Sequence, residues 1–516
     1  MTLGFAISQK RSQPTNRVVG GESIPAPVAG WNKRDPLFNM DPRFATILDN
    51  YFPQTNFVEL RKGHTSHATG VGSSAVETVF SYRSGSTKKL LASGGGGIYD
   101  ATASGAVGAP LASGFGSNRW QTTNFNSRGI LVNGTDAPQS YDGSTISAAG
   151  FTGSGLTPSD LFAVHPFKER LLFLENNSAS FWFGGVDAVT GSLSEFPLAS
   201  VHPEGGRAVA INTLTIDGGS GIDDLLCIFM ESGDVLIYAG TDPSSASTFA
   251  LIGIFSIGKP VGSRPLVKLG PDLIVITSDG YIPLRQFLRV ARSQTNLAIS
   301  DTISGAVSDA VRTFGANFGW QAVLYPRSNW LLFNVPKVEG GQADQHVMNT
   351  LTGAWCRFTG MDAVSWTNHE ERLYFGGTGG VVFLADDTAA DAGSSIIGDA
   401  QTAYVYFGGR ARLKRFTNFR PILSSDATVE VSMGLGVDFQ DAVGVNAVQS
   451  VATAGTLWNT ELWDTFLWAG GGTIQKNWQT AADIGTAAAV RVKTETNNQS
   501  VQWFSTDVLF EPGGFI

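Results

Sequence analysis

Residues 371–387 read ERLYFGGTGGVVFLADD, and this stretch shows the unit from which the chain is built. Two apolar runs, Leu373–Phe375 and Val381–Leu384, flank a turn that contains four glycines. Glycine accepts the positive φ angles that a tight hairpin turn requires. The stretch therefore predicts two short antiparallel strands joined by a turn.

The same order of apolar run, Gly/Asn/Asp turn and second apolar run occurs along most of the chain. Seven units are marked by Leu90, Ile130, Leu171, Leu225, Leu273, Leu331 and Leu373. Successive markers lie 40, 41, 54, 48, 58 and 42 residues apart. Strand-rich repeats of roughly 40–50 residues are typical of β-propeller blades, which bury their apolar faces against one another. We therefore predict an all-β fold with a β-propeller; a sandwich or a stacked array of hairpins is the alternative.

Composition fits a folded, strand-rich protein. The 516 residues leave room for two or three domains, and 42% hydrophobic with 15% charged residues argues against disorder. No apolar run approaches the roughly 18 residues of a membrane span, and we expect no secretory signal at the N-terminus. The net charge of −9 disfavours a protein that grips nucleic acid through its phosphates.

We predict three parts along the chain. Residues 1–60 form an N-terminal arm with a capping helix, residues 61–395 the propeller, and residues 396–516 a C-terminal β-rich domain. The capping helix is predicted because Asp41-Pro42 is a favourable helix start and Phe44, Ile47 and Leu48 would share one helical face. A partner-binding helix is the alternative reading of this segment.

A short helical insertion interrupts the strand pattern at about residues 284–315. Its second half has apolar residues at helical spacing from Ile303 to Phe314. Its first half carries Arg285, Arg289 and Arg292. These arginines are either a solvated face, partners for acidic neighbours or phosphate contacts.

The C-terminal domain supplies further candidates for an interface. Strand alternation would place Arg410, Arg412 and Lys414 on one face. Tryptophans in this region are either core residues or interface anchors. The complete set of predicted interface residues is Trp31, Phe38, Met40, Arg285, Arg289, Arg292, Arg410, Arg412, Lys414, Trp458, Trp463 and Trp468.

Motifs for catalysis are not found. The sequence has no G-x-S-x-G elbow, no H-E-x-x-H and no P-loop. His64 and His67 are the only close histidine pair, without a nearby cysteine or carboxylate to complete a metal site. We predict no catalytic residues, no metal and no cofactor, and we expect Cys227 and Cys356 to be buried thiols.

Several stretches resemble one protein family. They are WNKRDPLFNMDPRFATILDNYFP at residues 31–53, LLASGGGGIYD at 90–100, NGTDAPQSYDG at 133–143 and LTGAWCRF at 351–358. Together with the helical insertion they resemble the tail nozzle or tail hub proteins of short-tailed bacteriophages, which are akin to packaged-DNA stabilisation proteins. The resemblance covers roughly residues 31–420, and the tryptophan-rich C-terminal part matches least.

The resemblance implies a structural virion protein of the viral tail, assembled in the cytoplasm of the host bacterium. It implies a homohexameric ring that retains packaged DNA and guides its ejection. Its partners would be adaptor or head-to-tail connector proteins, tail fibres or spikes, double-stranded DNA in the lumen and the host cell surface. Two other classes remain open: a carbohydrate- or receptor-binding propeller, and a propeller-type glycan hydrolase whose site is assembled across blades.

Overall fold

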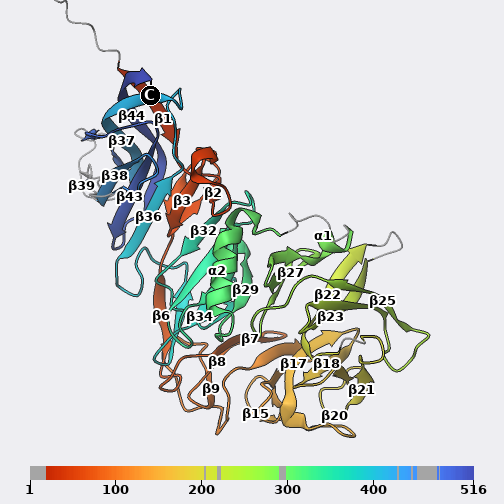
Figure 1. Ribbon diagram of the computed structural model, residues 1–516. Helices are drawn as coiled ribbons and strands as arrows, with labels where there is room; N and C mark the ends of the chain where they lie inside the picture. The colour runs from red at the N-terminus through yellow and green to blue at the C-terminus, as the bar shows by residue number, and fades with distance from the viewer. Residues whose placement is uncertain are drawn as a thin grey trace, which may run out of the picture.

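The computed structural model shows a propeller joined to an elongated β-domain (Figure 1). It describes residues 19–202, 205–217, 222–289, 298–426, 429–442, 446–449, 473–475 and 477–515. Nearly all the regular structure is β-strand, which confirms the predicted all-β class. No helix in these ranges has the length and apolar character needed to cross a membrane.

Seven sheets in the described part of the chain form the blades of the propeller. Their inner strands are β7 (Thr78–Ser84), β12 (Gln121–Phe125), β17 (Leu161–Phe167), β22 (Ala208–Asp217), β26 (Leu266–Leu269), β29 (Gln321–Tyr325) and β33 (Ser365–His369). The second strands carry the seven repeat markers and are β8 (Thr87–Gly94), β13 (Arg128–Val132), β18 (Arg170–Glu175), β23 (Ile222–Met230), β27 (Asp272–Thr277), β30 (Trp330–Pro336) and β34 (Arg372–Gly376). Each predicted repeat unit therefore corresponds to one blade, and its marker residue lies on the second strand of that blade.

The remaining blade strands lie further from the axis. The third strands are β9 (Gly97–Asp100), β14 (Gln139–Tyr141), β19 (Ser180–Phe183), β24 (Asp234–Gly240), β28 (Gly280–Pro283), β31 (Ala343–Asn349) and β35 (Val381–Ala385). The outer strands are β6 (His64–Thr69), β11 (Ala112–Ser113), β15 (Ile146–Ala148), β21 (Ser194–Pro197), β25 (Phe249–Ser256) and β32 (Trp355–Phe358). Short pairings are added by β10 (Gly105–Ala106), β16 (Phe151–Thr152) and β20 (Gly191–Ser192).

The propeller is closed by a strand from its own beginning. β6 pairs antiparallel with β35, so that the first propeller strand completes the blade that the last three strands form. Neighbouring inner strands contact one another around the circle, from β33 to β7 and on through β12 and β17. This arrangement confirms the propeller and rules out a stacked array of hairpins.

The helical insertion is confirmed at its predicted place. It consists of α1 (Leu284–Arg289), the short 3-10 turn η3 (Asp301–Ile303) and α2 (Ser304–Phe314). Helix α2 buries Val307 and Ala310, and it packs beside β28 and β30 (Figure 1). Further 3-10 turns are η1 (Leu37–Asn39), η2 (Pro158–Asp160) and η4 (Pro326–Ser328).

The C-terminal domain is a sandwich of two sheets. One layer consists of β37 (Arg412–Ser425), β44 (Val501–Phe515), β40 (Thr473–Gln475), β41 (Gln479–Thr480) and β42 (Ile484–Gly485), with β1 (Gly20–Pro25), β4 (Tyr51–Pro53) and β5 (Val58–Leu60). The other layer consists of β36 (Ile396–Thr402), β43 (Ala488–Thr496), β38 (Glu430–Val437) and β39 (Asn446–Gln449). The hydroxyl groups of Tyr51 and Thr494 form a buried hydrogen bond of 3.0 Å between the layers.

The predicted capping helix is wrong. Residues Phe44–Asp49 form strand β3, which pairs antiparallel with β36. The segment β2 (Gly30–Trp31) pairs parallel with β3 and with β32, the outer strand of the sixth blade. Pairing with strands distant in sequence outweighs the local helix preference of Asp41-Pro42, because tertiary packing routinely overrides propensity.

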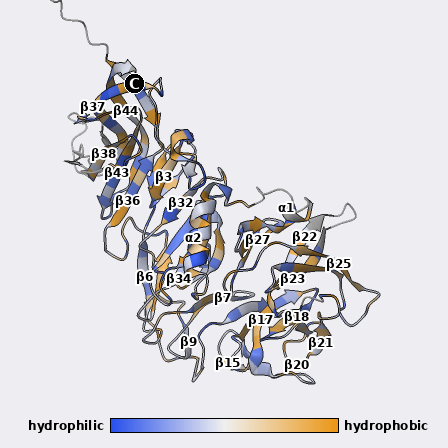
Figure 2. Cartoon of the chain, in the orientation of Figure 1, coloured by the Kyte–Doolittle hydropathy of each residue, from blue (hydrophilic) through white to orange (hydrophobic). Residues whose placement is uncertain are grey.

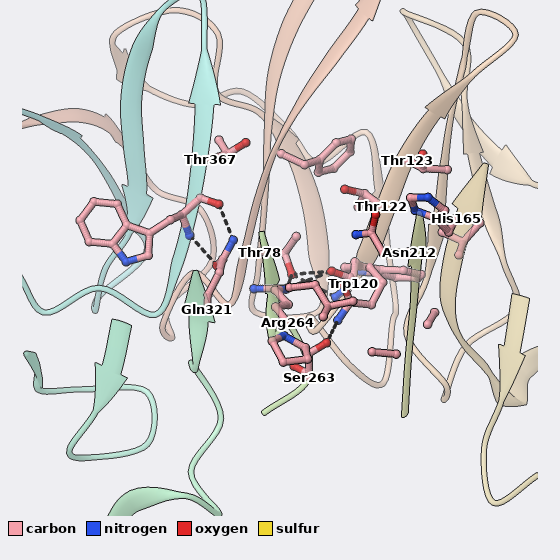
Figure 3. Close-up of a pocket in the computed structure, with 18 of the residues that line it drawn as sticks. Thr78, Trp120, Thr122, Thr123, His165, Asn212, Ser263, Arg264, Gln321 and Thr367 are labelled. Atoms are coloured by element: carbon pink, nitrogen blue, oxygen red, sulfur yellow. Dashed lines mark hydrogen bonds between the residues drawn. The ribbon is translucent and has the colours of Figure 1, made fainter. Parts of the chain in front are cut away.

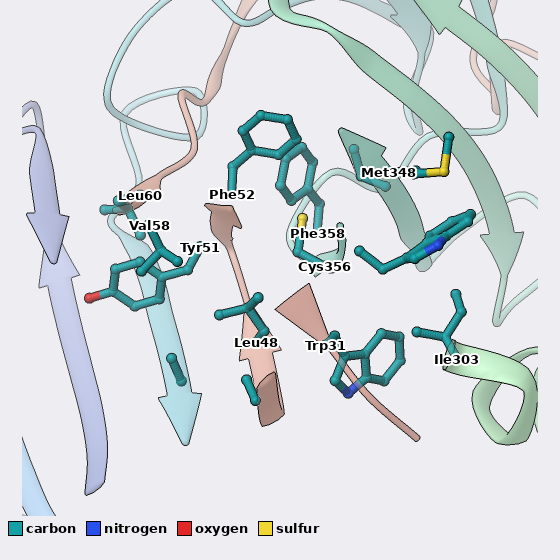
Figure 4. Packing of buried hydrophobic residues seen from close by; sticks show 14 of the residues in the cluster. Trp31, Leu48, Tyr51, Phe52, Val58, Leu60, Ile303, Met348, Cys356 and Phe358 are labelled. Carbon is teal, nitrogen blue, oxygen red and sulfur yellow. The ribbon is translucent and has the colours of Figure 1, made fainter. Parts of the chain in front are cut away.

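The N-terminal strands join propeller and sandwich into one sheet. Strands β29 to β32 continue through β2 and β3 into β36, β43, β38 and β39, ten strands in all. The buried cluster of Figure 4 spans this joint, with Trp31 and Leu48 between Ile303 of the insertion and Tyr51 of the sandwich. Both cysteines are buried and free, as predicted. Figure 2 shows hydrophobic residues in the strands of both parts.

The chain enters and leaves the propeller at one point. The guanidinium of Arg61 binds both carboxylate oxygens of Asp391 at 2.8 and 2.7 Å, and Arg61 is 3% exposed. Between them the backbone packs tightly, because a Cβ atom on Gly63 would lie 2.0 Å from the main-chain oxygen of Ala390. The segment that enters the propeller, at residues 61–63, and the segment that leaves it, at residues 390–391, therefore stabilise each other.

Acid is expected to destabilise the fold in part through His346. Burial lowers the pKa of His346 to about 3, whereas an exposed histidine titrates near 6.5. Between these pH values the unfolded chain binds a proton that the folded chain does not, so unfolding becomes easier as the pH falls. Urea denaturation between pH 4 and 7 should show a shallower pH dependence for His346→Gln than for the original chain. Equal slopes would contradict this assignment.

Candidate functional site

The inner strands of the seven blades enclose a central channel with a cavity of about 530 Å³ (Figure 3). About half of the residues that line it are polar, although apolar residues such as Phe80 and Ile211 also contribute. Strand β12, for example, presents Gln121, Thr122, Thr123 and Asn124. Amide and hydroxyl side chains can both donate and accept hydrogen bonds, so the wall suits a polar occupant or water.

The channel wall contains one guanidinium, one imidazole and no carboxylate among the described residues that line it. Glycoside hydrolysis ordinarily uses two carboxyl groups, one as acid and the other as nucleophile or base. The channel therefore lacks the pair that a propeller-type glycan hydrolase would need there.

Arg264 is the guanidinium of the channel. It donates hydrogen bonds to the hydroxyl of Thr78 at 2.7 Å, to the main-chain oxygen of Trp120 at 2.9 Å and to that of Glu77 at 3.2 Å. Burial lowers the pKa of Arg264 to about 10, so the side chain is still a cation at neutral pH. These contacts tie the blade of β26 to the blades of β7 and β12.

His165 is the imidazole of the channel and lies on β17. Burial, reinforced by the positive charge of Lys268, lowers the pKa of His165 to about 4. The ring is therefore neutral near pH 7 and can both donate and accept a hydrogen bond. Figure 3 places it with Thr122, Thr123 and Asn212 on one part of the wall.

A second cavity of about 580 Å³ contains a serine–histidine contact. Ser81 Oγ lies 2.9 Å from Nδ1 of His369, and burial lowers the pKa of His369. A catalytic triad also needs an acid that orients the imidazole. The adjacent Glu370 instead pairs with Lys88 at 2.7 Å, so the contact lacks that third member.

Three of the predicted interface residues are wrong, because they are buried within the chain. Trp31 is 4% exposed and donates from its indole to the main-chain oxygen of Thr46. Met40 is 6% exposed. Lys414 is 1% exposed, and its ammonium group donates to three main-chain oxygens, including that of Thr486 at 3.0 Å. Lys414 therefore faces the interior, whereas Arg412 is exposed.

Two predicted interface residues are brought together on the surface. Phe38 on η1 is 56% exposed, and the hydroxyl of Tyr406 donates to its main-chain oxygen at 3.2 Å. The guanidinium of Arg410 lies 4.8 Å above the Tyr406 ring and donates to Asn39 at 3.2 Å. We call this the Phe38–Arg410 patch; it consists of Leu37, Phe38, Tyr406 and Arg410.

The other predicted interface residues do not join this patch. Arg285 lies in α1 on the propeller, where its main-chain N–H donates to Asp272 at 2.8 Å. The side chain of Arg289 lies outside the described part of the structure. Arg292, Trp458, Trp463 and Trp468 also lie outside the described residues.

The sequence pattern does not identify the channel residues. Thr122, His165 and Asn212 lie on inner strands, and Arg264 lies two residues before β26. These positions fall outside the apolar run–turn–apolar run units that the sequence repeats. Each inner strand precedes a repeat marker by a few residues, and this position was the available indication.

Comparisons with known proteins give no family. No protein-family model matches the chain, and no curated protein matches it. Among solved structures, BBS1N in complex with ARL6DN shares 9% identity and a TM-score of 0.40, with 64% of this chain and 99% of that chain covered. Sqt1 of Saccharomyces cerevisiae shares 10% identity and a TM-score of 0.36, covering 66% and 96%.

An enzyme is also among the similar structures. The exo-beta-1,3-galactanase of Phanerochaete chrysosporium shares 8% identity and a TM-score of 0.24, with 75% of this chain and 95% of that chain covered. Likenesses this remote carry no argument about function. The fold described above rests on the sheets themselves.

Proposed function

We propose that the chain is a structural subunit of the tail nozzle of a short-tailed bacteriophage, assembled as a homohexameric ring. The observation that carries the proposal is the ten-stranded sheet that runs from the blade of β29–β32 into the sandwich. A continuous sheet fixes the propeller and the sandwich relative to each other without a flexible linker. This rigidity suits a subunit that occupies a fixed place in a ring. The sequence resemblance over residues 31–420 supports the same function.

In this proposal DNA passes between copies, not through one propeller. The channel cavity of about 530 Å³ has the size of a small-molecule pocket, for which roughly 300–1,000 Å³ is usual. A DNA duplex needs a far wider passage, so the lumen has to be enclosed by several subunits. An overall acidic chain, with its net charge of −9, favours sliding because it attracts phosphate less than a basic wall would.

The proposal is tested by the mass and shape of the assembled protein. Native mass spectrometry of the purified chain should give a six-fold multiple of 54.6 kDa. Electron microscopy of virions labelled with an antibody against the chain should place it at the distal end of the tail. A strict monomer that never joins virion tails would contradict the proposal.

Charge reversal at Arg410 of the Phe38–Arg410 patch, together with the exposed Arg412, should hinder ring assembly. We expect Arg410→Glu with Arg412→Glu to leave the monomer folded, because both side chains are exposed. Each exposed ion pair with a neighbour contributes only about 0–1 kcal/mol, but a ring repeats the contact in every subunit. Size-exclusion chromatography with light scattering would measure the loss of rings. Phe38→Ala should act in the same direction.

The matched control is Arg312→Glu, a reversal at an exposed arginine of α2. This variant should assemble like the original chain, since α2 belongs to the propeller and not to the patch. If the Arg410/Arg412 variant assembles normally but releases DNA more readily, the arginines face the lumen, and the predicted role in subunit contact is wrong.

A further inference from the structure

The propeller channel contains a cation whose hydrogen-bond partners are all neutral. Three of the five N–H groups of Arg264 donate to two main-chain oxygens and one hydroxyl, those of Glu77, Trp120 and Thr78. A charge held inside a protein is ordinarily matched by an opposite charge. Among the described residues, no carboxylate forms an ion pair with Arg264.

A neighbouring arginine makes the contrast clear. Arg119 binds the carboxylates of Glu77 at 2.9 Å and of Glu339 at 2.6 Å. Both arginines lie near the ring of Phe318, Arg119 at 4.3 Å and Arg264 at 5.3 Å. Both acids therefore bind Arg119 directly. The charge of Glu77 also favours the cation of Arg264 through space, but among the described residues no carboxylate oxygen forms an ion pair with Arg264. An anion in the channel would complete the environment of Arg264.

The channel has room for such an anion and for a hydroxyl-rich body attached to it. Its cavity of about 530 Å³ lies within the roughly 300–1,000 Å³ of small-molecule sites. Next to the Arg264 end, strands β12, β17 and β22 present the short polar side chains of Thr122, His165 and Asn212 (Figure 3). Hydroxyl, amide and neutral imidazole groups each donate and accept, which is what sugar hydroxyls require of a binding site.

The wall is also selective for the sign of charge. No described residue that lines the cavity is acidic, so a cationic ligand would find no partner there. A neutral sugar would leave Arg264 without a directly bound anion. A carboxylate can accept from the N–H groups of Arg264 that remain, and charge-assisted hydrogen bonds of this kind are the strong ones.

We propose that the channel binds a small sugar acid, with its carboxylate on Arg264 and its hydroxyl groups on the polar side chains of β12, β17 and β22. This site goes beyond the proposed nozzle function and does not depend on ring assembly. Within a virion it would give each subunit a place for an acidic sugar of monosaccharide size.

The test is calorimetric titration of the full chain at pH 7 with sodium D-glucuronate. We expect saturable binding of glucuronate and binding of D-glucose at least about tenfold weaker, because a hydrogen bond to a charged group contributes about 1.5–3 kcal/mol. Arg264→Gln should reduce glucuronate affinity by at least the same factor. Sodium phosphate tests whether Arg264 binds an inorganic anion instead of a sugar carboxylate. Its binding should also be weaker than that of glucuronate.

Arg128→Gln is the control, because it removes a guanidinium that pairs with Asp142 and does not line the cavity. It should retain glucuronate binding. Asn212→Leu removes a polar group of the wall without touching Arg264, and we expect it to weaken binding even if Arg264→Gln fails to fold. The inference is overturned if glucuronate binds no better than glucose, if phosphate binds as tightly as glucuronate, or if a folded Asn212→Leu variant binds unchanged. Ring formation in the same samples is read separately, so failure here leaves the nozzle proposal standing.

Discussion

Replacing Asp391 with asparagine is expected to lower the free energy of unfolding by about 3–5 kcal/mol, the usual loss when one partner of a buried ion pair is removed. Arg61 is almost fully buried and donates to both oxygens of this carboxylate. Its remaining donors are held by Asn50 and by the main-chain oxygens of Lys62 and Thr359. Asparagine preserves the shape but leaves the guanidinium charge without its counter-ion.

Chemical denaturation of the two proteins measures this loss. The control is Asp309→Asn, which breaks an exposed pair with Arg312 on α2 at 2.7 Å. Such exposed helix pairs contribute about 0.3–0.5 kcal/mol, so the control should unfold almost like the original chain. Equal destabilisation by both substitutions would show that the Arg61–Asp391 pair does not hold the joint.

The same pair gives a pH dependence of known sign. Burial opposes ionisation of Asp391, but the hydrogen bonds from Arg61 and His64 outweigh it and hold its pKa below the usual value. The contribution of the pair is therefore complete above about pH 4, where an aspartate in the unfolded chain is ionised. It is lost as the pH falls through the lower pKa of the folded state, and this acid-dependent loss should be absent in Asp391→Asn.

Trp31→Ala is the second substitution with a large expected effect, about 3–5 kcal/mol of lost stability. The indole is buried, its ring lies 5.6 Å from that of His346, and the guanidinium of Arg357 lies 5.7 Å from its centre. Truncation would leave a cavity where β2 joins the blade of β29–β32 to the sandwich. The loss should appear in the unfolding curve of the isolated monomer.

Phe38→Ala is the matched variant, seven residues along the same segment but 56% exposed. It should change monomer stability by less than about 0.5 kcal/mol, as surface substitutions usually do. If Trp31→Ala leaves the monomer curve unchanged and acts only on assembly, Trp31 is an interface residue and its burial in the core is contradicted.

The sequence predicts the second strand of every blade but not the first. Leu131, Phe173 and Leu332 lie in apolar runs that are buried between neighbouring blades, and such runs are visible without a structure. The inner strands face the channel on one side and carry polar residues there, such as Thr122 and Asn124. Because these residue types are also common in turns, the sequence does not mark these segments as strands. Arg264 could not be recognised, because its role depends on which blades close the circle.

At residues 41–49 the sequence predicts an element that the structure does not contain. Its local pattern favours a helix, with a proline after an N-cap acid and apolar residues at helical spacing. The structure makes it a strand because β36, more than 340 residues later in the chain, offers a partner edge. Likewise, the alternation of side chains along a regular strand predicts that Lys414 lies on the same face as Arg410 and Arg412. The register shift between Arg412 and Lys414 instead turns Lys414 inward.

The pairing of the N-terminal strand β1 with the C-terminal strand β44 has a consequence for the synthesis of the chain. Strand β1 ends at Pro25, whereas its partner β44 begins at Val501, so the ribosome adds roughly 475 residues between them. At roughly 5–20 residues per second, β1 waits for tens of seconds before its partner emerges. The propeller can close during that time, since its last strand is finished at Ala385. A nascent chain that stops early would thus display unpaired N-terminal strands, which distinguish an incomplete chain from a complete one.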